Sequence, residues 1–228
     1  NPVRRSAVVG ALTVAIIFSV YHFSIGPYTE IPSDFWARLG DVKDQLVLVQ
    51  SGTFSATDGI SRLVDDTAYV PFLHAVVANN LRTLPLWLIP PVTWATSLLF
   101  LLGIYWFTLR LVVRIRIKKS RKIVIAMLAS GFTLVTYGVA TFSYVRYYAY
   151  FPHILNATLM LSALALFLDY QERVNTRAPV LLLVGIIVLT MSLVNQQEAL
   201  FAVVLMIAIS LWRMVSAFRK NGCVSLLL

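Results

Sequence analysis

Long apolar stretches, separated by short polar segments, make up most of the sequence. Six of them carry almost no charged residues: 7–25, 85–109, 123–145, 151–168, 179–194 and 199–218. About 20 mainly apolar residues in a helix cross the hydrocarbon core of a bilayer. The stretch 179–194 is short, so we expect it to be tilted, flanked by protein or partly re-entrant. The pattern predicts an all-α polytopic membrane helix bundle of about six spans, with residues 1–228 as one transmembrane domain.

The segment 26–82, between the first two spans, is the longest stretch outside the predicted membrane region. Part of it has apolar residues at helical spacing, at Phe35, Leu39, Val42, Leu46 and Val49. The opposite side of this helix carries Asp34, Arg38, Asp41 and Gln45. Ser33 is a suitable N-cap. We therefore predict an amphipathic helix that starts at Ser33 and lies along the membrane surface.

Prolines mark two further points of this region. A second short helix is predicted within 60–81, where Pro71 is expected to kink or divide it. The next span begins with Pro85, Pro90 and Pro91, which are expected to interrupt its regular backbone hydrogen bonding.

Composition and charge agree with a membrane protein. The hydrophobic fraction is 59% and the charged fraction 13%, against roughly 45–50% and about 25% in soluble domains. The net charge of +9 does not indicate a nucleic-acid partner, because the basic residues cluster in alternate turns, chiefly 4–5, 110–122, 173–177 and 213–220. Most of the acids fall on the other side. This positive-inside pattern predicts both termini in the cytoplasm, with the plasma (inner) membrane as the expected location.

Several common kinds of site are absent from the sequence. Cys223 is the single cysteine, so neither an internal disulfide nor a cysteine-based metal motif can form. No Gly-rich phosphate loop, HExxH or GxSxG motif is present. These absences argue against a cytosolic ATPase, a zinc protease and a serine hydrolase of the common types.

Carboxylates in the first outer segment are the first candidates for chemistry. Glu30 and Asp34 follow the first span closely, and either could act as a general base toward an acceptor hydroxyl. The alternative to a catalytic role is that these are simply exposed acids. For Asp34, the helix dipole also favours an acid in the first turn of a helix. The tandem pair Asp65 and Asp66 could hold a divalent cation together with a pyrophosphate, or could simply be solvated.

Polar residues of the later outer turns are the other candidates. Arg146 lies among tyrosines, where it could contact a phosphate or anchor the chain at the interface. His153 could contact a phosphate, relay a proton or make an interfacial hydrogen bond. In "LVNQQEALFA", the side chains of Gln196, Gln197 and Glu198 could bind a polar ligand or form a solvated hairpin. The sequon at Asn156 falls inside a predicted span and should be unusable.

The order of these features resembles the GT-C superfamily of polyprenyl-phosphate-sugar glycosyltransferases. The shared order of features is an uncleaved first helix, a long acidic outer loop with an amphipathic helix, and then spans joined by short loops. The strings "YTEIPSDFW", "RYYAYFPH" and "NQQEALF" correspond to the base-bearing loop and the polar turns that line the cavity. Six spans are fewer than the family usually has, which leaves open that the sequence is a piece of a longer protein.

The resemblance implies a mechanism and a set of partners. Asp34 is the implied base, with Glu30 second, and Arg146 and His153 neutralise the phosphate of a lipid-linked sugar donor in the bilayer. Transfer proceeds with inversion, and no cofactor is expected, although a divalent cation stays an option. The alternative function is a non-enzymatic polytopic protein, such as a transporter or an assembly subunit. Polar residues that gather at the outer ends of spans favour the enzyme over a conduit with a mid-membrane site.

The basic run 110–122 has two interpretations. It could attract anionic lipid headgroups, or it could serve only to fix the topology of the chain.

Overall fold

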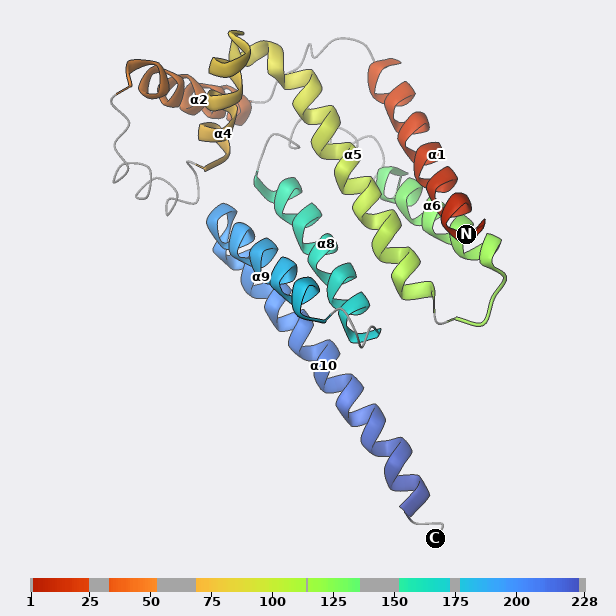
Figure 1. Ribbon diagram of the computed structural model, residues 1–228. Coiled ribbons are helices and arrows are strands. Elements are labelled where there is room, and N and C mark those ends of the chain that lie inside the picture. Colours follow the sequence, from red (N-terminus) through yellow and green to blue (C-terminus); the bar gives the residue numbers. More distant parts are fainter. Residues whose placement is uncertain are drawn as a thin grey trace.

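The computed structural model describes residues 2–24, 33–52, 69–113, 115–135, 152–172 and 177–225 (Figure 1). Every regular element in these ranges is a helix, so the predicted all-α class is confirmed. The helices are α1 (Pro2–Ser24), α2 (Ser33–Ser51), α4 (Tyr69–Leu81), α5 (Pro85–Val112), α6 (Lys119–Val135), α8 (Pro152–Glu172), α9 (Arg177–Val194) and α10 (Gln196–Ser225).

Four of these helices are long and apolar enough to cross a membrane: Arg5–Ser24, Pro85–Val112, Ile154–Gln171 and Gln196–Ser216. The chain is accordingly an integral membrane protein. The apolar part of α9, Ala178–Val194, is shorter, as the sequence predicted for 179–194. The stretch 123–145 lies only partly within the described residues, so the count of six spans stays a prediction.

The long helices form two units that meet along α5 and α8 (Figure 1). Helix α5 packs against α1 and α6 on one side and against α8 on the other, and α8 packs against α9 and α10. Helices α2 and α4 lie at the end where α5 and α8 begin, which we call the α2–α4 end. The opposite end, where α5 ends and α6 begins, carries Arg110, Arg116, Lys118, Lys119 and Arg121 and is called the basic end.

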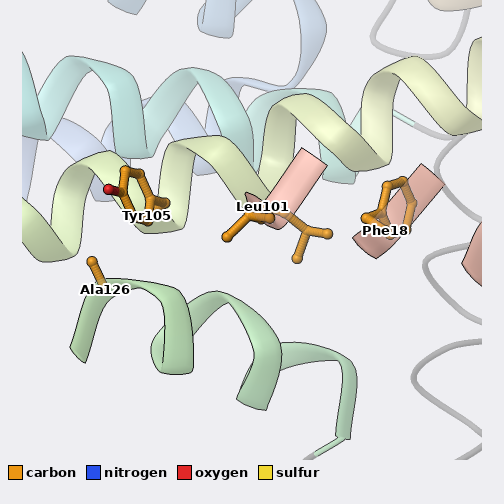
Figure 2. Close-up of a cluster of buried hydrophobic side chains, with 5 residues drawn as sticks. Phe18, Leu101, Tyr105 and Ala126 are labelled. Carbon is orange, nitrogen blue, oxygen red and sulfur yellow. The ribbon is translucent and has the colours of Figure 1, made fainter. Parts of the chain in front are cut away.

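The α1–α5–α6 unit is held by apolar packing and by bonds between helices. Phe18, Leu101, Tyr105 and Ala126 form its buried core (Figure 2). The Tyr105 hydroxyl donates to the Ala7 carbonyl at 2.8 Å, and a Cβ at Gly10 would collide with that hydroxyl. Small residues allow such close approach between membrane helices, because no side chain separates the two backbones. This explains why α1 and α5 pack tightly near the basic end.

The prolines at the start of α5 do not divide the helix. Pro85 is its first residue, where a missing N–H costs no intrahelical bond. Pro90 and Pro91 each remove one bond to a carbonyl in the first turn, but the helix continues through both. The Thr93 hydroxyl donates to the carbonyls of Ile89 at 2.8 Å and Pro90 at 3.1 Å. The expected loss of backbone bonds is therefore confined to one turn.

The α2–α4 pair corrects two expectations about the amphipathic helix. Val42 is fully buried, and with Leu46 and Val49 it packs against Ala75 of α4 and Ile89 of α5. This apolar face is covered by protein, so it is not the surface that would lie on the bilayer. Gln45, expected on the polar side, is also buried, because a residue three after Val42 and four before Val49 borders the same helix face.

Helix α4 runs unbroken from Tyr69 to Leu81, and the earlier part of the predicted helix, 60–68, lies outside the described residues, so a division near Pro71 stays a prediction. That proline is the third residue of α4, in the first turn, where its ring has no preceding turn to collide with. The helix ends with Arg82 at a φ of 51°, and the N–H of Thr83 reaches the Ala78 carbonyl at 3.0 Å. This αL ending turns the chain directly into α5.

Candidate functional site

The turn between α9 and α10 is built around Asn195. Its Oδ1 accepts hydrogen bonds from the backbone N–H of Gln197 at 3.1 Å and of Glu198 at 3.4 Å. Its own N–H donates to the Met191 carbonyl at 2.8 Å, which closes the end of α9. Asparagine is among the preferred N-cap residues, because its side-chain oxygen satisfies first-turn donors. One of the four polar residues of the predicted cluster is therefore a helix cap.

Asn156, in the second turn of α8, ties this turn to the rest of the bundle. The residue is 0% exposed, and its Nδ2 donates to the carbonyls of Met191 and Asn195, each at 3.3 Å. Both carbonyls also accept backbone N–H groups, so the amide occupies their second lone pairs. The Oδ1 of Asn156 is buried, and no described residue donates to it. The start of α8 and the start of α10 are thus fixed to each other.

The remaining residues of the turn differ in their surroundings. Gln196 and Gln197 are exposed at the α2–α4 end, where their amides can reach a ligand. Glu198 is half-buried in the first turn of α10, where the positive end of the helix dipole favours a carboxylate. This arrangement offers two neutral amides and one anion to a polar molecule.

Two other predicted site residues lie at helix starts on the same end. Asp34 is the second residue of α2, and His153 is the second residue of α8, three positions before Asn156. Helix α4, which packs against α2, also contacts α5 and α9. The structure therefore brings together the beginnings of α8 and α10, with α2 connected to them through α4.

The other predicted site residues lie outside the described residues. These are Glu30, Asp65, Asp66 and Arg146. Their assignments stay predictions from the sequence.

His74 is a buried residue that the sequence reading did not single out. It is only 7% exposed in α4, next to Ala75, and burial lowers its pKa to about 4. The cause is the loss of solvation, which penalises the imidazolium form. Helical spacing could have identified it, because His74 shares the face of Pro71 and Ala78, which are also buried. The α2–α4 end therefore contains a histidine that is neutral at pH 7.

An ion pair at the basic end was also missed. Arg110 of α5 and Asp169 of α8 lie 2.6 Å apart, and their side chains are 30% and 9% exposed. Two residues on, the Gln171 amide donates to the Ser210 hydroxyl of α10 at 3.5 Å. The signal in the sequence was a carboxylate directly after the apolar stretch 151–168, where an acid needs a partner. The pair joins the two three-helix units.

Neither metal chemistry nor similarity identifies the site further. Within the described residues, no group of three or more His, Cys, Asp or Glu side chains could hold a metal ion. No protein-family model, curated protein or solved structure matches this chain.

Proposed function

We propose that the chain is an integral membrane glycosyltransferase of the GT-C type. It transfers a sugar from a polyprenyl-phosphate donor to an acceptor hydroxyl at the α2–α4 end. One observation carries the proposal: helix starts that bear Asp34, His153 and the Gln196–Glu198 group gather at one end of an apolar helix bundle. An enzyme whose donor is anchored in lipid needs polar groups at such a rim, because the reacting sugar stays near the headgroups.

The proposed reaction is a single displacement at the anomeric carbon. The Asp34 carboxylate, with Glu30 as second candidate, takes the proton of the acceptor hydroxyl as its oxygen forms the new bond. The bond from the anomeric carbon to the donor phosphate breaks, and the phosphate leaves with the electron pair. Arg146 and His153 neutralise that phosphate, with Asp65 and Asp66 available for a divalent cation.

The sugar itself is assigned to the α9–α10 turn. The exposed amides of Gln196 and Gln197 suit sugar hydroxyls, because an amide can both donate and accept. Glu198 accepts from a further hydroxyl. Asn195 and Asn156 hold this turn in place.

The proposed topology follows from the charges at the two ends. The basic end faces the cytoplasm and the α2–α4 end faces outward, with α6 and α9 completing six spans in the plasma membrane. Both termini are then cytoplasmic. Arg5, Arg116 and Lys118 lie at the basic end, which supports this orientation.

Replacement of Asp34 by asparagine tests the proposal most directly. The chain would be reconstituted in vesicles with a panel of polyprenyl-phosphate sugars, and transfer would be followed with radiolabelled donor. Asp34→Asn should lower the rate about 100-fold or more, the usual contribution of a general base. Asp44→Asn is the matched control, because Asp44 is exposed on the same helix and should keep the wild-type rate. Wild-type transfer in the Asp34 variant, or no transfer by the wild type with any donor, would contradict the proposal.

A second candidate function is transport or assembly without catalysis. The Arg110–Asp169 pair favours it, because ionisable residues within membrane helices often mark ion or substrate pathways. It predicts proton or ion flux in vesicles that Asp169→Asn abolishes and Asp34→Asn does not. A pH-sensitive dye inside the vesicles would measure this flux.

A further inference from the structure

The connection between α5 and α6 exposes cations and apolar side chains side by side. Its exposed cations are Arg116, Lys118, Lys119 and Arg121, which we call the basic loop surface. Among them and at the end of α5, Leu111 is 50% exposed, Val113 43% and Ile115 51%. An exposed apolar group next to several cations is a mixture that suits a membrane interface better than open water.

Internal bonds hold this connection in shape without using the four cations. Lys122 donates through Nζ to the Val113 carbonyl at the end of α5. The Ile115 N–H donates to the Val112 carbonyl at 3.1 Å and the Ile117 N–H to Ile115 at 2.9 Å. Two basic residues are therefore committed within the protein, Lys122 to a carbonyl and Arg110 to Asp169. No described carboxylate forms an ion pair with the four exposed cations.

The charges at the start of α6 favour binding of an external anion. Helix α6 has no acidic residue in its first turn, which instead contains Lys119 and Arg121. Cations at the positive end of a helix repel the dipole and one another. Among the described side chains no acid compensates these cations, which leaves them accessible to an anion outside the protein.

We infer that the basic loop surface docks on the headgroups of anionic phospholipids in the adjoining leaflet. The four cations face the phosphates, and Val113 and Ile115 enter the boundary of the acyl chains. The choice of a bilayer follows from charge complementarity and from the position of the surface at the end of α5, a helix long and apolar enough to cross a membrane. This inference does not depend on the proposed glycosyltransferase activity.

Lipid titration of the purified full chain tests the inference. The chain in a neutral detergent would be titrated with phosphatidylglycerol or with phosphatidylcholine of identical acyl chains, and binding measured by native mass spectrometry. Only the anionic lipid should bind with appreciable affinity. Each cation should contribute roughly five-fold, so Lys118→Gln with Arg121→Gln should weaken the affinity roughly 25-fold at low salt. Lys43→Gln with Arg82→Gln removes two exposed cations at the α2–α4 end and should leave it unchanged.

Four results would overturn the inference. The first is equal affinity of the wild type for both lipids, and the second is an unchanged affinity in the Lys118 and Arg121 variant. The third is displacement of the lipid by millimolar inorganic phosphate, which would indicate a soluble anion as the ligand. The wild type provides a check that needs no variant, because salt raised from about 0.1 to about 1 M should screen the contact strongly. The fourth overturning result is an affinity that stays the same as salt rises, which would exclude headgroup binding by these cations.

Discussion

Helix α8 is joined to its neighbours at both ends, by a neutral amide at one end and by an ion pair at the other. Near its start, the fully buried Asn156 donates to the carbonyls of Met191 and Asn195. Near its end, Asp169 pairs with Arg110, whose side chain is 30% exposed. The neutral contact lies within the α8–α9–α10 unit, whereas the charged contact crosses to the other unit.

The two contacts differ in what remains when one partner is removed. Without the Asn156 amide, both carbonyls keep their backbone partners, the N–H groups of Asn195 and Ala199. Without Asp169, a guanidinium next to apolar helices loses its counter-charge, and an unpaired charge costs far more than a lost neutral hydrogen bond. Removal of one partner is therefore more costly at the basic end than near the start of α8. The Asn156 contacts, at the end that carries the proposed site, are neutral hydrogen bonds whose loss costs less.

Loss of Asp169 should have the largest effect on stability. Asp169→Leu is expected to lower the free energy of unfolding by about 3 kcal/mol, because Arg110 is left without a partner. Replacing both residues, with Arg110→Met added, should recover most of that loss. Unfolding in mixed detergent micelles, followed by circular dichroism, would measure both variants. A double variant as unstable as the single one would mean that the pair itself, not the orphaned charge, supplies the stability.

Loss of the Asn156 amide should have a smaller effect on stability, and the effect should be confined to the α2–α4 end. Asn156→Leu removes two hydrogen bonds to carbonyls and should cost about 2 kcal/mol. Hydrogen exchange should speed up at residues 195–199 while α5 is unaffected. Thr158→Val is the control, because among the described residues the Thr158 hydroxyl bonds only to the Ile154 carbonyl of its own helix. Equal changes in the two variants would remove the special role of Asn156.

Acid pH should destabilise the α2–α4 end through His74, because its imidazole is buried in the neutral form. Its pKa is about 4 in the folded protein and about 6.5 ordinarily, so the unfolded chain binds more protons between these values. Stability is therefore full above pH 6.5 and falls as pH drops toward 4, by about 2 kcal/mol at pH 5. Hydrogen exchange in α2 and α4 would measure the loss. His74→Phe should abolish this pH dependence, and its persistence in that variant would assign the effect to other groups.

The apolar pattern predicted the helices better than it predicted their partners. Spacing placed Val42, Leu46 and Val49 on one face of α2, but it could not show that α4 and α5, rather than lipid, cover that face. The pairing of Arg110 with Asp169 could likewise not be predicted from the sequence, because it depends on how α5 packs against α8. Asn195 was readable in principle, since an Asn followed three residues later by Glu198 is a known helix-start pattern.

Loss of the Asn195 cap should have the smallest effect on stability, and it tests the α9–α10 turn most specifically. Asn195→Ala should cost about 1 kcal/mol, because the N–H groups of Gln197 and Glu198 lose their acceptor. Asn195→Ser keeps a capping oxygen and should restore most of that stability in the same unfolding measurement. If Asn195→Ser is as unstable as Asn195→Ala, the cap is not the source of the effect. If it is stable but transfers sugar poorly, Asn195 contributes to the ligand surface as well as to the turn, and the polar string is more than a helix start.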